Sequence, residues 1–445
     1  MEQARGQWGS STGFILAAAG SAIGLGNIWR FPYVAGEYGG AAFVLLYLAC
    51  VVLICLPYLF AELVLGRYSH KNPVGAIEAI RGRRSLWAWA GALGVLTGVG
   101  ILSYYAVIAG WTLGYIFKSF VAPHMEFGAF TGDALVTIPL FALFMILTIG
   151  VVLGGVESGI ERTAKVLMPV LLVLMLLVIL RGLTLPGAMA GLSFYLKPDF
   201  SQVTTSTVLT ALGQAFFSLS LGMGAMITYG SYLPKGADLR TAGAFVAFFD
   251  TLIAVLAGFM IFPAVFAMGE SPDAGPSLVF VVLPKVFASM PMGSMVSVVF
   301  FVLLGIAALT STVSLLEVVV AYFVDERHWS RKKSAWSVGF VTFLLGLPAA
   351  LSQGAVGSLT HMQLFGKESV LGIMDFIWGN ISLALGGLLL SVFVGWIWGV
   401  KRAGEELKLG SGITDRGIAF WGVFIRYICP VVIFVVLLDV FGVFR

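Results

Sequence analysis

The chain has 445 residues, of which 59% are hydrophobic and only 11% are charged, and its net charge is +4. Soluble domains carry about 25% charged residues, so this composition excludes a soluble globular protein and indicates a polytopic protein of the lipid bilayer. The small net charge gives no sign of a nucleic-acid partner. Cys50, Cys55 and Cys429 lie in apolar runs and the four histidines share no metal-ligand spacing, which disfavours a disulfide framework and a zinc site.

Eleven apolar runs are long enough to span a bilayer, which takes about 20 residues in a helix. They cover residues 11–36, 41–67, 87–118, 135–154, 163–183, 206–232, 239–268, 293–324, 334–352, 368–398 and 417–443. Lys and Arg gather in the segments that are cytoplasmic if the N-terminus is inside, for example at 81–84 and 331–333. We therefore predict a protein of the cell (inner) membrane with a cytoplasmic N-terminus and, because the helix number is odd, a C-terminus outside.

The first run contains an interruption where an unbroken helix would be expected. Gly24, Gly26, Asn27, Arg30 and Pro32 fall within its middle and outer half. Backbone groups freed at mid-membrane are tolerated only where they line an enclosed or wet cavity, and an Arg at that depth requires a carboxylate partner. Two interpretations stay open: a broken helix whose loose N–H and C=O groups bind a polar ligand and cations, or a kinked helix that packs on its neighbours through glycine.

The sixth run has a matching interruption at residues 218–224, five helices after the first. An odd number of helices per half makes the second half enter from the opposite side, so the pattern predicts an inverted repeat. Paired interruptions at corresponding positions are the best sequence pointer to a transporter binding site. We expect one all-α transmembrane domain, 1–445, with repeats at about 8–183 and about 206–398 and an extra peripheral helix at about 417–443.

Several motifs follow one another along nearly the whole chain. They are Trp8, the string GSAIGLGNIWRFPY at 20–33, Glu62, Gly66-Arg67-Tyr68, Tyr104-Tyr105, Trp111-Thr112-Leu113-Gly114, Gly213-Gln214-Ala215-Phe216-Phe217, Leu309-Thr310-Ser311 and Met374-Asp375-Phe376. Together they resemble the neurotransmitter:sodium symporter family, whose bacterial members transport amino acids. The resemblance implies a LeuT-type fold of two inverted five-helix repeats, with helices 1 and 6 broken, that works by alternating access. The predicted eleven helices differ from the twelve of many relatives.

The resemblance also implies the binding residues of a zwitterionic substrate. The substrate carboxylate would face the N–H groups where the outer half of helix 1 starts, at the positive end of its dipole, and the ammonium would face carbonyl and hydroxyl oxygens. The implied set is Ala22, Leu25, Gly26, Ile101, Tyr105, Phe217, Ser218, Ser220, Met223, Ser311 and Leu315. Met223 stands where relatives often place Phe. Because Met is slim and adaptable, we expect the pocket to admit large hydrophobic or aromatic L-amino acids.

Two sodium sites are implied by the same resemblance. Sodium site 1 would comprise Ala22, Asn27, Ser218 and Asp250 together with the substrate carboxylate, which would couple ion to substrate directly. Sodium site 2 would comprise Gly20, Ile23, Ala307, Thr310 and Ser311. Hydroxyl and carbonyl oxygens of this kind suit a hard cation, although a Thr-Ser pair in a helix commonly bonds only to its own backbone.

The resemblance further implies two charged gates. Arg30 and Asp375 match the outer pair, and Arg5 and Asp325 match the inner pair. Gly159 and Pro169 enclose a spacing in helix 5 that relatives link to unwinding on the inner side, or else they are simply a helix start and a kink. The loop at 269–292 is either a lid or a passive connector.

Chloride is required by many members of the family, whereas chloride-independent relatives place a carboxylate near sodium site 1. Here Asp250 stands at a position that is often Asn, Ser218 replaces the more usual Thr, and Ala254 offers no hydroxyl to hold an anion. We therefore expect two sodium ions per transport site and no chloride requirement.

The leading interpretation is thus a sodium-coupled symporter of neutral amino acids, a monomer or homodimer. Because Glu62, Asp250, Glu317 and Asp375 are carboxylates at membrane depth, proton coupling is the alternative within transport, and a transporter-like sensor is a further one. An enzyme is disfavoured, since no histidine lies at membrane depth and no HExxH or GxSxG motif occurs.

Overall fold

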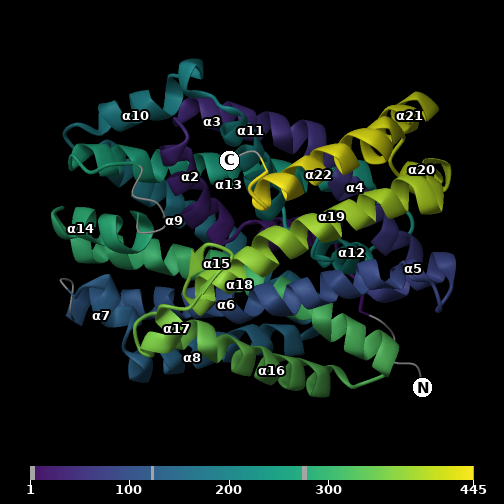
Figure 1. The fold of residues 1–445 in the computed structure, drawn as a ribbon, viewed down its shortest axis with the longest axis horizontal. Coiled ribbons are helices and arrows are strands. Elements are labelled where there is room, and N and C mark those ends of the chain that lie inside the picture. Colours follow the sequence, from purple (N-terminus) through teal and green to yellow (C-terminus); the bar gives the residue numbers. More distant parts are fainter. Residues whose placement is uncertain (1–5, 122–124, 273–277, 444–445) are drawn as a thin grey trace.

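The computed structural model describes residues 6–121, 125–272 and 278–443, which fold almost entirely into helices (Figure 1). Within these residues nine helices are long and apolar enough to cross a membrane, or ten if a bent pair in the first run counts as one span. The nine are Ala41–Ser69, Ala88–Val121, Ala134–Leu153, Val156–Leu183, Leu239–Ala267, Gly293–Arg327, Arg331–Leu351, Val370–Lys408 and Asp415–Val440. The predicted number of eleven stays a prediction, because the sixth run is divided into two helices that are each shorter than a span.

The elements follow the chain as three groups. The first group is α1 (Ser11–Ala22), η1 (Gly26–Arg30), α2 (Phe31–Glu37), α3 (Ala41–Cys50), η2 (Val51–Cys55), α4 (Leu56–Ser69), α5 (Pro73–Arg81), α6 (Ala88–Val121), α7 (Phe127–Thr131), α8 (Ala134–Leu153), η3 (Val156–Glu161) and α9 (Arg162–Leu183). The second is α10 (Ala188–Leu196), η4 (Phe200–Gln202), α11 (Thr205–Ser218), α12 (Ala225–Gly230), α13 (Leu239–Ala267), η5 (Leu278–Val282), α14 (Leu283–Ala288), α15 (Gly293–Arg327) and α16 (Arg331–Leu351). The third is α17 (Gly357–Thr360), β1 (Gln363–Leu364), β2 (Lys367–Glu368), α18 (Val370–Met374), η6 (Asp375–Ser382), α19 (Leu383–Val392), η7 (Phe393–Gly399), α20 (Val400–Lys408), α21 (Asp415–Val423), η8 (Phe424–Ile428) and α22 (Cys429–Val440). The two short strands pair antiparallel, Gln363 with Glu368 and Leu364 with Lys367.

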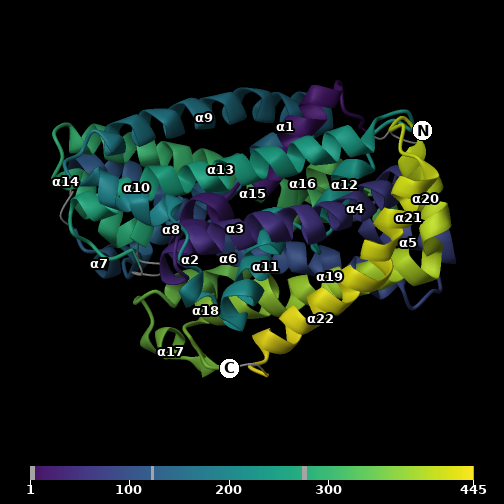
Figure 2. The same cartoon turned by 90° about the horizontal axis from the view of Figure 1, so that it is seen from above.

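The helices form two packed groups with the broken first run between them. One group is α4, α12 and α13, and the other is α6, α8, α15 and α16. α1 packs on α13 of the first group and on α15 of the second. Figures 1 and 2 show α5 and α20 near the N-terminus, at what we call the N-terminal end, and α7, α10 and α14 at the opposite end. The long helices thus hold the broken run at the centre of the molecule.

The first run breaks where the sequence predicts it. α1 ends at Ala22, and Ile23 has an extended ψ of 108°. The chain then continues as η1 and α2, bent by 51° relative to α1. A Cβ on Gly24 would lie 2.3 Å from Ser311 Oγ and 2.5 Å from Tyr105 Oη. Glycine is therefore needed here because two other helices approach the backbone closely.

The sixth run breaks between α11 and α12. Ser220, Gly222 and Gly224 have positive φ angles of 53°, 80° and 78°, which no helix accommodates. A Cβ on Gly222 would also lie 2.5 Å from the carbonyl oxygen of Leu383. The Gly222 N–H freed by the break donates to the buried Glu62 carboxylate at 2.8 Å. Both predicted breaks are therefore real, and the simple kinked helix is wrong as an interpretation of the first run.

Candidate functional site

A small cavity lies between the two helix breaks. Its volume is about 20 Å³, and it is lined by Ala22, Gly24, Gly26, Ile101, Tyr105, Phe217, Ser220, Met223, Ser311 and Leu315. Nine of the predicted substrate residues are among these, so the structure brings nearly the whole predicted set together. Leu25 and Ser218 do not line this cavity. Gly24 lines it as well; it belongs to the interrupted string but was not predicted as a binding residue.

The backbone of the first break presents its polar groups toward this cavity and its surroundings. The Leu25 N–H donates to the Tyr105 hydroxyl at 2.7 Å. The Gly26 carbonyl oxygen accepts from Gln214 Nε2 at 2.8 Å, and the Ser220 hydroxyl donates to the Ser21 carbonyl oxygen at 3.0 Å. These bonds come from α6, from α11 and from the second break, and they satisfy groups that an intact helix would have satisfied internally.

A first polar cluster, which we call the Asp250 cluster, comprises Asn27, Tyr47, Ser218 and Asp250. Asn27 Nδ2 donates to Asp250 Oδ1 at 2.7 Å and to Ser218 Oγ at 2.9 Å. Ser218 Oγ lies 3.0 Å from Asp250 Oδ2, and the Tyr47 hydroxyl contacts both Ser218 and Asp250. The Asn27 and Asp250 side chains are fully buried. Tyr47 was not predicted, since a tyrosine in an apolar run carries no sign of such a role.

A second polar cluster, the Ser311 cluster, comprises Ile23, Ala307, Thr310 and Ser311. Thr310 Oγ1 donates to the Ala307 carbonyl oxygen at 3.0 Å and lies 3.4 Å from that of Ile23. Ser311 Oγ lies 3.4 Å from the same Ile23 oxygen. Gly20, also predicted here, packs on Thr310: a Cβ at Gly20 would lie 3.3 Å from Thr310 Cβ. The cluster therefore gathers neutral oxygens from the first break and from α15.

A larger cavity of about 480 Å³ adjoins the small one, and its lining extends to Phe127 of α7, the helix at the end opposite the N-terminus. Gly26, Tyr105 and Phe217 line both cavities, so these residues form the partition between them. Leu25, Arg30 and Asp375 line the larger cavity as well.

The predicted outer gate is only partly assembled across this larger cavity. The Arg30 guanidinium lies 4.7 Å from the centre of the Phe217 ring and bonds to Asn380 Oδ1 at 3.3 Å. Asp375 Oδ1 accepts from the Tyr104 hydroxyl at 2.9 Å. In the described part of the chain Arg30 and Asp375 form no direct ion pair, because Arg30 reaches across to Asn380 of η6, the element that Asp375 begins, while Asp375 accepts from Tyr104.

The N-terminal end of the site is closed by packing and by polar contacts. Trp8 is buried, and its Nε1 donates to the Tyr229 carbonyl oxygen at 2.9 Å. Glu317 pairs with Arg331 at 2.5 Å and accepts from the Tyr232 hydroxyl at 2.7 Å. Glu317 was predicted only as a carboxylate at depth, and its cation was not found from the sequence.

The predicted inner gate falls partly outside the described residues. Arg5 is not among them. Asp325 Oδ2 accepts from the Asn72 backbone N–H at 2.9 Å and from Asn72 Nδ2 at 3.2 Å. Glu161, near the predicted unwinding site at Gly159, holds the chain ahead of α1 by accepting from Gly9 N at 2.7 Å and from Ser10 Oγ at 2.8 Å.

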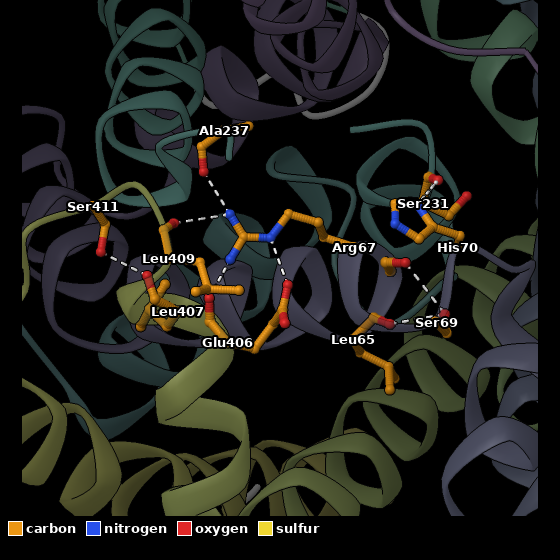
Figure 3. A network of polar contacts seen from close by, with 11 residues as sticks. Leu65, Arg67, Ser69, His70, Ser231, Ala237, Glu406, Leu407, Leu409 and Ser411 are labelled. Carbon is orange, nitrogen blue, oxygen red and sulfur yellow. Dashed lines mark hydrogen bonds and ion pairs between the residues drawn. The ribbon is translucent and has the colours of Figure 1, made fainter. Parts of the chain in front are cut away.

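Arg67, at the end of α4, holds three segments of the N-terminal end together (Figure 3). The side chain is fully buried. Its Nε donates to Glu406 Oε1 at 2.7 Å, and its Nη1 donates to the carbonyl oxygens of Ala237 and Leu409 at 2.5 and 3.1 Å. A buried guanidinium with this many acceptors is a structural anchor. It ties α4 to α20 and to the loop ahead of α13.

A bent membrane helix, a second break opposite it and oxygen-rich clusters beside a central cavity together define a multi-pass secondary transporter. The sequence model of the sodium:neurotransmitter symporter family matches residues 5–128 and 129–445. The chain therefore belongs to the sodium:neurotransmitter symporter family and is a sodium-dependent transporter, not an enzyme.

Similar proteins cover almost the whole chain. An uncharacterized sodium-dependent transporter of Bacillus subtilis, YhdH, is 40% identical over 451 residues, which span 99% of this chain and 99% of YhdH. An uncharacterized sodium-dependent transporter of Haemophilus influenzae is 35% identical over 98% of both chains. The crystal structure of MhsT in complex with L-phenylalanine superposes with a TM-score of 0.90 at 45% identity, covering 98% of this chain and 100% of MhsT. The predicted family and the predicted fold class are confirmed, and the roles of individual residues stay predictions.

Proposed function

We propose that the chain couples sodium to the movement of neutral L-amino acids with large hydrophobic or aromatic side chains across the cell (inner) membrane. It works by alternating access, with a cytoplasmic N-terminus and the C-terminus outside. The observation that carries the proposal is the set of residues around the cavity between the two helix breaks, which combines backbone and hydroxyl groups with the apolar side chains of Ile101, Met223 and Leu315. MhsT, whose fold is so similar, was crystallised with L-phenylalanine, which supports this substrate class.

The contacts in the small cavity suggest how a zwitterion would be held. The substrate carboxylate would take the place of the Tyr105 oxygen at the Leu25 N–H, and the Tyr105 hydroxyl would then donate its proton to that carboxylate. The Gly26 N–H would be the second backbone donor. The ammonium would face the Phe217 carbonyl oxygen and the Ser220 hydroxyl, while Ser218 lies farther away, in the Asp250 cluster.

Sodium would bind in both polar clusters. In the Asp250 cluster the Asn27 amide points its N–H₂ at the carboxylate and its oxygen at the Gly24 N–H. A sodium ion would replace the Nδ2 donor, and the amide would turn so that Oδ1 faces the ion. The Asp250 carboxylate would supply the negative charge that chloride supplies in other members of the family, so we propose two sodium ions and no chloride requirement.

The test is a panel of the twenty amino acids, competing with labelled substrate on the purified protein, with and without sodium. We expect Phe, Tyr, Trp and Leu to compete more strongly than Gly and Ala, and only when sodium is present. A panel in which Gly or Ala binds best would refute the proposed side-chain class. Uptake into liposomes should be the same in sodium gluconate as in sodium chloride, and a loss of uptake in gluconate would refute the role of Asp250.

Proton coupling is the second candidate, and Glu62 is the residue that favours it. The carboxylate is fully buried and accepts from the Gly222 N–H beside the cavity. Within the described residues no Lys or Arg pairs with it, and an unpaired carboxylate at such depth can be held as the neutral acid. Uptake driven by an inward pH gradient without sodium would favour this candidate.

The transporter-like sensor is tested separately. Accumulation of labelled substrate above equilibrium would exclude a sensor.

A further inference from the structure

The segment ahead of α1 is bonded to one buried carboxylate, that of Glu161. Glu161 is the last residue of η3 and is 1% exposed. Its Oε2 accepts from the Gly9 N–H at 2.7 Å, and its Oε1 accepts from the Ser10 hydroxyl at 2.8 Å. The Lys165 ammonium lies 2.6 Å from Oε1 and supplies the counter-charge. Hydrogen bonds that end on a charged group are stronger than those between neutral groups.

The first turn of α1 also packs directly on this carboxylate. A Cβ on Gly13 would overlap Glu161 Oε1, so glycine is needed for the close approach. Throughout the described residues, no other hydrogen bond joins residues 6–22 to residues 156–183. The Glu161 carboxylate is therefore the polar connection between α1 and the η3–α9 helix.

The other end of α1 leads into the Ser311 cluster. α1 packs on α9 and on α15, and Figure 2 shows it beside α9. Directly after α1, the Ile23 carbonyl oxygen lies 3.4 Å from both Thr310 Oγ1 and Ser311 Oγ. α1 has 12 residues, and its own backbone hydrogen bonds make it a stiff rod about 18 Å long. A displacement of its start therefore displaces the Ile23 oxygen relative to the two hydroxyls.

We propose that Glu161 is a positioning residue of sodium-dependent transport. Its carboxylate holds the start of α1, and α1 thereby keeps the Ile23 carbonyl oxygen where it binds sodium in the Ser311 cluster. The inference rests on the proposed sodium binding in that cluster. Because coupling between two positions is reciprocal, sodium in the cluster should also stabilise the two bonds to Glu161. Loss of these bonds should lower sodium affinity although every ligand of the ion is still present.

The sharpest variants change Ser10, because capping of α1 can be separated there from the contact with Glu161. The Ser10 hydroxyl oxygen accepts from the Gly13 N–H at 3.0 Å and so caps the helix. Asp and Asn cap helices as well as Ser does. Ser10→Asp keeps the cap but loses the donor to Glu161 and sets two carboxylates against each other. Ser10→Asn is the matched control, because its oxygen can cap α1 while its N–H₂ donates to Glu161.

The first measurement is a titration of the purified full chain with radioactive sodium. We expect the concentration for half-maximal binding to rise roughly tenfold in Ser10→Asp, the value of one hydrogen bond to a charged group, with maximal binding kept. In Ser10→Asn it should stay within about twofold of the unmutated protein. A role in capping alone predicts no change in either variant. An unchanged titration of Ser10→Asp, or equal rises in the two variants, overturns the proposal.

A second pair of variants tests the contact from η3. Glu161→Ala removes both acceptors, whereas Glu157→Ala removes an exposed carboxylate of η3 that forms no ion pair in the described chain. At saturating sodium, hydrogen exchange at residues 9–14 should be roughly tenfold faster in Glu161→Ala and unchanged in Glu157→Ala. Equal exchange in the two variants overturns the proposal.

The titration also separates this inference from the proposed function. An unmutated protein that binds no sodium would refute the proposed sodium sites, and this inference with them. Sodium binding that is normal in the unmutated protein and equally tight in Ser10→Asp would refute the role of Glu161 alone.

Discussion

The Asp250 cluster and the Ser311 cluster flank the same helix break but are built from different chemistry. The first holds a fully buried carboxylate with an amide and two hydroxyls around it. The second holds only hydroxyls and backbone carbonyl oxygens, two of the contacts being as long as 3.4 Å. Deleting one member of a buried charged pair costs far more free energy than deleting one neutral ligand. The two clusters should therefore respond very differently to substitution.

The comparison also separates two ways of holding a cation. Asp250 needs positive charge or strong donors at all times, and the Asn27 amide supplies donors in the structure described here. The carbonyl oxygen of Ile23 faces the Thr310 and Ser311 hydroxyls because α1 ends at Ala22, so the Ser311 cluster depends on the helix break itself. Charge dominates the first cluster, and backbone geometry dominates the second.

The largest effect is expected from Asp250→Asn. Breaking a buried ion pair by removing one partner costs about 3–5 kcal/mol, which corresponds to at least ~100-fold in sodium affinity. Sodium-dependent substrate binding and uptake should therefore almost disappear, as measured with purified protein in liposomes.

The double variant Asp250→Asn, Ala254→Ser is the matched test of the charge argument. The added hydroxyl lies one turn along α13 and could hold an anion that replaces the lost charge. Activity should return in chloride and not in gluconate. Full activity of the single variant at ordinary sodium would contradict the assignment.

Asn27→Ala should have the next largest effect. The variant removes a donor to a charged group, worth about 1.5–3 kcal/mol, and removes a sodium ligand at the same time. We expect the sodium concentration that gives half-maximal substrate binding to rise roughly 10- to 100-fold. An unchanged sodium requirement would mean that Asn27 serves only to bond Gly24 and Asp250.

The contrast between the clusters also shows what the sequence could predict. Span lengths follow from bilayer thickness, so the predicted 239–268 is observed as Leu239–Ala267. Both breaks were predictable because each depends on glycine: Gly222 and Gly224 adopt positive φ angles at the second break, and Gly24 allows close approach at the first. The contact of Tyr47 with Asp250 was not, since it joins residues 203 apart and leaves no local pattern. Arg67 was recognised as a motif residue, but its pairing with Glu406 was not predictable, because Glu406 lies 339 residues along the chain.

Ser311→Ala should have a smaller effect than either change in the Asp250 cluster. One neutral hydroxyl ligand is worth at most about 1.5 kcal/mol, so the sodium requirement should rise roughly tenfold while maximal binding is kept. Ser314→Ala is the matched control on the same helix, because its hydroxyl donates only to the Ser311 carbonyl oxygen at 2.9 Å. Equal sodium titrations of the two variants would remove Ser311 from the site.

Tyr47→Phe should have the smallest effect on sodium affinity. The variant tests whether Tyr47 is a ligand of the ion in the Asp250 cluster. The ring packs 4.8 Å from that of Phe31, and Phe keeps this contact while removing only the hydroxyl. The hydroxyl contacts are long, 3.1 Å to Ser218 and 3.3 Å to Asp250, so their loss should cost about 0.5 kcal/mol, or roughly twofold in sodium affinity. A tenfold or larger rise in the sodium requirement, measured as for Asn27→Ala, would instead make Tyr47 a ligand of the ion. The Asp250 cluster would then contain an ion ligand that was not among the residues predicted from the sequence.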